Sequence, residues 1–230
     1  MKTIGLLGGM SWESSLLYYQ TINRAVRDAG DDRLRSAPII LDSVDFAPMA
    51  QWMGAADFEA IAAFLITRAK MLEAAGAQVL GLCTNTMHKV FERIAAQVAI
   101  PMIHIATPTI AALQAAGVQR AAFLGTQLSM SERFLADVYA QAGIELLMPA
   151  PLQQSEVHRI IMSELCQGVV RDESRAAYVQ ILADLQSQGA QAVVLGCTEI
   201  TLLVQAQHID APLFDTADLH AKALAQACLS

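Results

Sequence analysis

The feature that most constrains the fold is an alternation, found twice along the chain, of short apolar runs with longer amphipathic stretches. The apolar runs predict strands at 3–7, 39–44, 79–82, 102–105, 121–124, 145–148, 193–195 and 213–214. The amphipathic stretches predict helices near 13–28, 57–75, 86–97, 107–116, 129–142, 153–166, 172–188 and 216–228. Strands that are apolar throughout and alternate with helices are typical of parallel sheets covered on both faces.

The order of these signals repeats between two halves of the chain. A stretch that runs from Gly-Ala-Gln through apolar residues to Cys-Thr occurs at 76–84 and again at 189–198. Matches of this kind lie about 111 to 117 residues apart, far beyond the period of a solenoid. We therefore predict an α/β fold of two similar Rossmann-like halves, with parallel sheets related by pseudo-two-fold symmetry and an active site in the cleft between them. The expected domains are 1–105 together with 215–230, and 106–214.

Composition argues against several classes of protein. Hydrophobic residues make up 54% of the 230 residues and charged residues 16%, so a large core is available and disorder is not expected. The net charge of −7, without a basic cluster, argues against nucleic-acid binding. No run of 18 apolar residues predicts a membrane span, and the N-terminal apolar run is too short for a signal peptide. Because four cysteines do not make a disulfide framework, we expect a cytoplasmic protein with free thiols.

Two of the four cysteines lie where open α/β sheets form their sites. Cys83 and Cys197 each end a predicted strand and precede a threonine, and ligands gather at the carboxyl ends of parallel strands. The start of a following helix is expected to lower the pKa of such a thiol. Two opposed thiols could take a proton from one face of a carbon and return one to the other face. Cys166 and Cys228 lie within helical patterns and are interpreted as inert core residues.

Other polar positions leave alternatives open. Cys83 and His88 are five residues apart, but no CxxC or HxxxH spacing accompanies them, so a metal site is not expected. The segment 5–11 lacks the GxGxxG and P-loop patterns, and is interpreted either as one wall of a small-anion pocket or as a tight turn. Thr84 and Asn85 are expected to help hold a carboxylate or to cap the following helix.

The histidines carry weaker signals. His104, on a predicted strand, is interpreted as a core residue or as a partner of a site residue. His158 and His208 are expected at the surface. No role follows from the sequence for His88 or His220.

Four segments carry a resemblance to a known family: residues 8–14, 83–88, 125–126 and 196–199. With these segments the chain resembles the aspartate/glutamate racemase family of cofactor-independent amino-acid racemases, over essentially its full length. In particular it resembles the bacterial branch of broad-specificity amino-acid racemases. The resemblance implies an isomerase that interconverts L- and D-amino acids, forms a homodimer, and needs neither pyridoxal phosphate nor a metal.

The resemblance also implies roles for individual residues. Cys83 and Cys197 would act on opposite faces of the substrate α-carbon, one as thiolate base and the other as thiol acid. The glycine loop and the Thr-Asn-Thr segment would hold the α-carboxylate, and the Thr-Glu pair after the second cysteine would face the amino group. The binding residues so implied are Met10, Ser11, Thr84, Asn85, Thr86, Thr126, Thr198 and Glu199.

Two departures from the family pattern concern the substrate side chain. Aspartate-selective relatives usually carry an arginine after the second strand and a lysine before the helix near residue 160. Here 46–53 contains no cation, and Glu156 stands where the lysine is expected, with Arg159 nearby. We therefore expect acidic amino acids to be poor substrates, and neutral polar or basic ones to be preferred, with Glu156 as a candidate partner. Gln51 and Trp52, in a stretch interpreted as a loop, are candidate lining residues.

Several alternative functions stay open. An aspartate/glutamate racemase proper would share both thiols. Hydantoin racemases, maleate isomerases and decarboxylases share the scaffold, and the presence of two thiols favours 1,1-proton transfer over decarboxylation by a single cysteine. A two-lobed amino-acid-binding protein is the non-enzymatic alternative.

Overall fold

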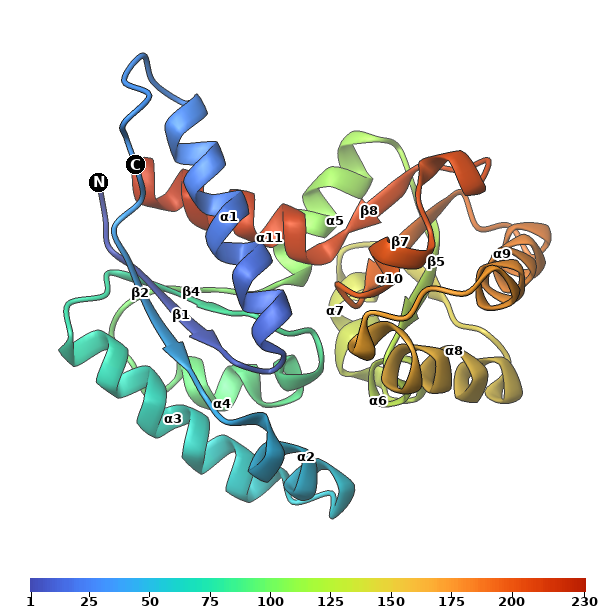
Figure 1. The fold of residues 1–230 in the computed structure, drawn as a ribbon, viewed down its shortest axis with the longest axis horizontal. Coiled ribbons are helices and arrows are strands. Elements are labelled where there is room, and N and C mark those ends of the chain that lie inside the picture. The colour runs from blue at the N-terminus through green and yellow to red at the C-terminus, as the bar shows by residue number, and fades with distance from the viewer. The chain divides into compact units, whose positions relative to one another are not determined.

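The chain divides into two units in the computed structural model, which describes all 230 residues (Figure 1). Unit 1 contains Met1–Ile105 and Ala217–Ser230, and unit 2 contains Ala106–Thr216. The predicted boundary after residue 214 would cut strand β8 (Leu213–Asp215), which pairs with the sheet of unit 2. The chain instead leaves unit 2 after Thr216, where this strand has ended.

Unit 1 is built on a four-stranded parallel sheet with the strand order β2-β1-β3-β4. Its strands are β1 (Ile4–Gly8), β2 (Ile39–Ser43), β3 (Val79–Leu82) and β4 (Met102–Ile103). Strands β1 and β3 are central, and every residue in them is buried. Burial on both faces is the reason why their sequences are apolar throughout.

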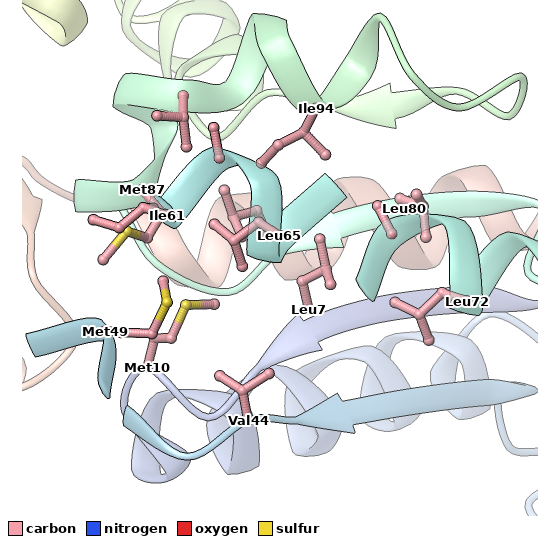
Figure 2. Packing of buried hydrophobic residues seen from close by; sticks show 14 of the residues in the cluster. Leu7, Met10, Val44, Met49, Ile61, Leu65, Leu72, Leu80, Met87 and Ile94 are labelled. Atoms are coloured by element: carbon pink, nitrogen blue, oxygen red, sulfur yellow. The ribbon is translucent and has the colours of Figure 1, made fainter. Parts of the chain in front are cut away.

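Helices cover both faces of this sheet. They are α1 (Trp12–Asp28), α2 (Phe46–Gly54), α3 (Phe58–Ala74), α4 (Phe91–Ala95) and α11 (Thr216–Leu229), with a 3-10 turn, η1 (Thr86–Val90). On one face Leu7 and Leu80 pack with Ile61 and Leu65 of α3, in the cluster that Figure 2 shows. Fully burying one such side chain contributes about 1.5–3 kcal/mol, so this cluster is a main source of stability for unit 1.

Cys83 belongs to the cluster on the opposite face of the sheet. There Leu6 and Val79 pack with α1 and with Leu224 of α11. Gly81 makes room for this helix, because a Cβ at that position would lie 2.4 Å from Leu224 Cδ1. Since side chains alternate along a strand, positions 79, 81 and 83 face the same side. The C-terminal helix therefore covers the face toward which Cys83 points.

Unit 2 repeats this topology with the strand order β6-β5-β7-β8. Its other strands are β5 (Arg120–Gly125), β6 (Glu145–Leu147) and β7 (Ala192–Gly196). Its helices are α5 (Ala106–Ala115), α6 (Gln127–Ser131), α7 (Arg133–Gln141), α8 (Pro151–Ser163), α9 (Asp172–Ser187) and α10 (Ile200–Leu203), with the 3-10 turns η2 (Leu165–Gln167) and η3 (Ala206–His208). The prediction of two similar α/β halves with parallel sheets is confirmed. No helix in either unit combines the length and the apolar character that crossing a bilayer requires.

The helices differ from the prediction in several places. The helix predicted near 86–97 is the 3-10 turn η1 followed by the short helix α4. The stretch 46–53, interpreted as a loop, is the helix α2, which Asp45 caps by accepting from a backbone N–H at 3.0 Å. Pro48 lies in its first turn, where the missing N–H costs no helical bond. The single helix predicted at 129–142 is two helices, because the backbone of Glu132 is extended. Helix α10 has no predicted counterpart, since four residues are too few to show a period.

Candidate active site

Cys83 lies directly after the carboxyl end of β3, in the centre of the unit 1 sheet. Its N–H donates to the Leu7 carbonyl at 2.9 Å and extends the β1–β3 ladder, while its own carbonyl accepts from Ser14 Oγ at 3.1 Å. The side chain is fully buried. Burial raises the pKa of the Cys83 thiol, because low-dielectric surroundings disfavour the thiolate. Cys83 is therefore a neutral thiol at neutral pH in this structure.

Cys197 has the matching position in unit 2, directly after β7. Its partly exposed thiol donates to Glu199 Oε2 over 2.9 Å, and Thr198 Oγ1 donates to the same oxygen over 2.7 Å. The pKa of Cys197 is raised well above its usual value, first by burial and then by the charge and the hydrogen bond of Glu199. Glu199 therefore favours the protonated form of Cys197.

The residue before Cys197 has to be glycine. A Cβ at Gly196 would lie 2.2 Å from Cζ of the buried Phe123 ring. Gly196 also pairs with Gly125 in the β5–β7 ladder. Phe123 therefore fills the space that any larger residue at the end of β7 would need, and Cys197 begins where the ladder stops.

The expected lowering of the thiol pKa by a following helix is wrong for both cysteines, since burial raises both pKa values. Cys83 is followed by the five-residue 3-10 turn η1, and Cys197 by the four-residue helix α10. Neither thiol faces a long series of aligned peptide dipoles, so the cost of desolvation exceeds any gain from a helix terminus.

The glycine loop between β1 and α1 requires glycine at position 9. Gly9 has a φ of +89°, and a Cβ there would lie 2.2 Å from the Val44 carbonyl oxygen. The Gly9 N–H donates to Ser15 Oγ at 2.8 Å, so a substrate anion would have to compete for it. Ser11 caps α1 by accepting a backbone N–H at 3.2 Å. Met10 is buried in the cluster of Figure 2.

Thr84, Asn85 and Thr86 lead from Cys83 into η1. Asn85 and Thr86 are buried, and Thr84 is partly buried. The alternative of a helix cap is not found for Asn85, whose side chain makes no capping bond to η1. The Thr84 carbonyl accepts from Nδ1 of His88 at 2.7 Å. Unit 1 thus holds two hydroxyls and an amide in mostly buried positions directly after Cys83.

Thr126 lies beside Cys197 at the carboxyl edge of the unit 2 sheet. Gly125 and Gly196 are paired in the β5–β7 ladder, so Thr126 and Cys197 are the next residues on adjacent strands. Thr126 also caps α6, with its Oγ1 accepting from the Ser129 N–H at 3.4 Å. Unit 2 therefore brings Thr126 to the same edge as Cys197, Thr198 and Glu199.

Gln51 and Trp52 lie on helix α2 and not in a loop. Gln51 is exposed, whereas Trp52 packs against Phe64 of α3 with ring centroids 5.7 Å apart. Trp52 is also partly buried against the unit 1 core. Packing within unit 1 therefore accounts for the position of Trp52.

Glu156 is already paired with a cation. On α8 its two carboxylate oxygens accept from Arg159 at 2.8 and 2.7 Å. Arg159 also donates to Glu164 at 3.0 Å, and the buried Glu164 accepts from Ser174 Oγ at 2.6 Å. The hydrogen bond from Arg159 lowers the pKa of Glu156. Two carboxylates thus neutralise Arg159, and Glu156 is ionised at neutral pH.

Tyr178 connects this ion-pair group with the surroundings of Cys197. It is a fully buried residue of α9 whose hydroxyl donates to the Val157 carbonyl at 2.9 Å. Burial raises its pKa, and so do electrostatic interactions with Cys197, Glu156 and Glu164. These three groups therefore lie within electrostatic reach of one phenol oxygen. No sequence pattern marks Tyr178, because its neighbours come from distant segments.

The two remaining cysteines differ from each other. Cys228 is a core residue, as predicted. The interpretation of Cys166 as a core residue is wrong, because α8 ends at Ser163 and the turn η2 leaves the Cys166 side chain exposed. None of the four cysteines forms a disulfide. No group of three or more His, Cys, Asp or Glu side chains is placed to hold a metal ion.

Unit 1 also contains a cluster of histidines that sequence reasoning missed. His88 and His220 are buried. The centroid of the His88 ring lies 4.6 Å from the centroid of the His104 ring and 6.1 Å from that of the His220 ring. Burial lowers the pKa of His104 and of His220 to about 4, and that of His88 well below its usual value. These residues come from three distant segments, so only the fold brings them together.

The two units have parallel sheets of the same topology, and each unit has a cysteine at the carboxyl end of its third strand. These features define the class of two-unit α/β racemases. The chain belongs to the Asp/Glu/Hydantoin racemase family, whose model matches residues 7–224. The family predicted from the sequence, and with it the assignment to the isomerases, is confirmed.

Three similar proteins place the chain within this family. A putative Asp/Glu racemase from Yersinia pestis is 42% identical, with a TM-score of 0.94 and 100% of both chains covered. An aspartate racemase homologue from Pyrococcus horikoshii OT3 is 28% identical, with a TM-score of 0.86 and the same 100% coverage. A broad specificity amino-acid racemase from Bacillus subtilis (strain 168) is 26% identical over 158 residues, which are 69% of this chain and 68% of that protein.

Proposed function

We propose that this racemase interconverts L- and D-amino acids by two-base 1,1-proton transfer, with Cys83 and Cys197 as the bases and no cofactor. The observation that carries the proposal is the equivalence of the two cysteines. Each follows the third strand of a parallel sheet, at the edge where α/β proteins bind ligands. The similarity to the broad specificity amino-acid racemase of Bacillus subtilis supports a free amino acid as substrate. A homodimer and a cytoplasmic location stay predictions.

The reaction needs one thiolate and one thiol. The thiolate removes the α-proton from one face of the carbon and becomes a thiol, while the opposite thiol gives its proton to the other face and becomes the thiolate. Burial raises the pKa of both thiols, so a thiolate is scarce without a nearby cation. The α-ammonium group of an amino acid is such a cation, and a positive charge favours the thiolate. The substrate itself therefore supplies the charge that allows one thiol to ionise.

Because of Glu199, the two thiols differ in how readily they ionise. Its carboxylate accepts hydrogen bonds from Cys197 and Thr198, whereas only burial raises the pKa of Cys83. An α-ammonium group bound at Thr198 and Glu199 would neutralise this carboxylate. Cys197 would then lose the anionic acceptor that keeps it protonated. Substrate binding and ionisation of Cys197 are coupled in this way.

The α-carboxylate is assigned to the loops that begin at the first strand and at Cys83. Asn85 and Thr86 support this assignment, because buried hydroxyl and amide groups can donate to an anion where water is excluded. Met10, Ser11 and Thr84 complete the proposed set for the carboxylate, and Thr126 is proposed as a further binding residue. The same donors would hold the negative charge that develops when the α-proton leaves.

The side chain of the substrate is proposed to be neutral polar or basic. Helix α2 contains no cation that could pair with a second carboxylate. Arg159 is neutralised by Glu156 and Glu164, so it offers little attraction to an acidic side chain. A basic substrate would share the Glu156 carboxylate with Arg159, and an acidic one would be repelled by it.

A panel of amino acids analysed by chiral chromatography tests this function. We expect turnover of homoserine, lysine or arginine to exceed that of aspartate and glutamate. Glu156→Gln, which keeps the shape and removes the charge, should lower kcat/KM for lysine relative to homoserine. Aspartate as the best substrate of the wild-type enzyme would refute the side-chain assignment.

The same panel separates the alternative functions. Turnover of a hydantoin or of maleate, with none of any amino acid, would place the chain in another branch of the scaffold. Binding of an amino acid that survives Cys83→Ser and Cys197→Ser, without turnover in the wild-type protein, would identify a binding protein. Racemisation lost in both variants supports the two-thiol mechanism.

A further inference from the structure

His88 binds the backbone through both of its ring nitrogens. Nδ1 lies 2.7 Å from the Thr84 carbonyl oxygen, and Nε2 lies 3.0 Å from the Ile105 amide nitrogen. A carbonyl can only accept and a backbone amide can only donate, so the proton is on Nδ1 and Nε2 accepts. His88 is therefore a neutral Nδ1–H tautomer.

The ring of His88 is held on its face and at its edge as well. Phe91 stacks on it with ring centroids 5.3 Å apart and an interplanar angle of 7°, and His104 packs edge-on at 4.6 Å. The ring is almost completely buried. These contacts fix the direction of Nδ1–H, and with it the position of the Thr84 carbonyl.

Three hydrogen bonds connect the peptides around Cys83 to other elements, each to a different one, and a fourth joins the Thr84 N–H to the nearby Leu82 carbonyl at 2.8 Å. The Cys83 N–H donates to β1 and the Cys83 carbonyl accepts from Ser14 of α1. The Thr84 carbonyl accepts from His88. The last bond is the one nearest to Asn85, where the proposed carboxylate-binding segment continues.

We propose that His88 is a positioning residue for proton transfer at Cys83: its Nδ1–H holds the Thr84 carbonyl and so fixes the backbone between Cys83 and the carboxylate-binding residues. This inference rests on the proposed racemase function. His88 acts through Thr84 and contacts no reacting atom. A displacement of a reacting group by about 1 Å can cost about 100-fold in rate, so one backbone hydrogen bond at this place has a large effect on turnover.

His220 offers a matched comparison within the same cluster. Its Nε2 donates to the Ile103 carbonyl over 2.8 Å, and its Nδ1 accepts from the Tyr18 hydroxyl over 2.8 Å. It is buried and makes two hydrogen bonds, as His88 does, but neither partner belongs to the loop after Cys83. Loss of a His220 bond should therefore weaken the fold without displacing Thr84.

Two substitutions separate the two bonds of His88. His88→Asn places an amide nitrogen where Nδ1 lies, so it keeps the donor to Thr84 and loses the acceptor for Ile105. His88→Gln reaches the position of Nε2, so it keeps the acceptor and loses the donor. We expect kcat to fall about 10- to 100-fold in His88→Gln and to stay close to the wild-type value in His88→Asn.

His220→Asn and His220→Gln are the controls, because each removes one bond of a buried imidazole. We expect them to lower Tm about as much as the His88 variants do, and to keep a kcat close to wild type. If both His88 variants lose kcat equally, or if kcat follows Tm in all four variants, His88 is only a packing residue and the proposal is overturned.

Two measurements that need no turnover distinguish failure of this inference from failure of the proposed function. Nitrogen NMR of the imidazoles should show an Nδ1–H tautomer for His88 and an Nε2–H tautomer for His220. Alkylation by iodoacetamide, with Cys166 and Cys197 replaced by serine, reports how often the buried Cys83 thiol becomes accessible, and it should be faster in His88→Gln than in His88→Asn. An Nε2–H tautomer at His88, or equal alkylation rates in the two variants, would overturn the proposal even in an active racemase.

Discussion

Replacing Glu199 by glutamine separates the charge of this residue from its shape. In the wild-type protein the Cys197 thiol donates to the Glu199 carboxylate over 2.9 Å. A hydrogen bond to a charged group contributes about 1.5–3 kcal/mol. This corresponds to about 10- to 150-fold in the equilibrium between thiol and thiolate. Glu199→Gln keeps a side-chain oxygen for Thr198 and removes the charge, so Cys197 should ionise more readily.

The rate at which iodoacetamide alkylates Cys197 measures this change. Cys83→Ser and Cys166→Ser in the background leave Cys197 as the reactive thiol at the site. A less basic thiolate is also a weaker nucleophile, which removes about half of the gain on a logarithmic scale. We therefore expect alkylation at a fixed pH to be about 3- to 12-fold faster in Glu199→Gln.

A control variant tests whether the effect is local. Glu145→Gln removes the same charge from the start of β6, where Glu145 pairs with Arg120, at the amino edge of the same sheet. It should leave the alkylation rate unchanged. An alkylation rate that is unchanged or lower in Glu199→Gln would refute the reasoning that Glu199 keeps Cys197 protonated.

Acid should weaken the fold through His220, because its pKa of about 4 lies below the ordinary value of 6.5. The folded state therefore binds fewer protons than the unfolded chain, and stability is lost as the pH falls from 6.5 to 4. Urea titrations should show a loss of about 3 kcal/mol from this residue, and an equal acid loss in His220→Gln would contradict it. Gly9→Ala should lower the free energy of unfolding by about 2 kcal/mol or more, because the new Cβ would meet the Val44 backbone and Gly9 has a positive φ. Gly54 has open space around it, so Gly54→Ala should change the free energy of unfolding little. Cys166→Ser should leave kcat unchanged, and a large loss would argue against the assignment of the thiol pair.

The strands could be predicted from local sequence because they are buried on both faces. Val79–Leu82 and Ala192–Gly196 lie in the centre of their sheets, so nearly every residue in them is apolar. Helix α2 was not predictable in the same way, because the stretch 46–53 is apolar on all sides and contains Pro48, which hides the helical period. The position of each cysteine after its strand follows from the same local pattern.

The environment of the cysteines could not be predicted, because it depends on tertiary contacts. Burial reverses the expected effect of the following helix on the pKa of Cys83. The bonds of His88 join residues 84 and 105, and the position of Tyr178 near Cys197 depends on how α9 packs. Glu156 departs from the family pattern in the sequence itself, but its pairing with Arg159 depends on the folded helix.

Racemisation in deuterium oxide, stopped at low conversion, tests the central claim most directly. If Cys83 and Cys197 act as two separate bases, the product enantiomer should carry deuterium at the α-carbon while the recovered substrate enantiomer still carries hydrogen, in both directions. Cys83→Ser and Cys197→Ser should each abolish racemisation. Deuterium appearing equally in both enantiomers at early times, or racemisation that survives either substitution, would contradict a mechanism with two cysteine bases.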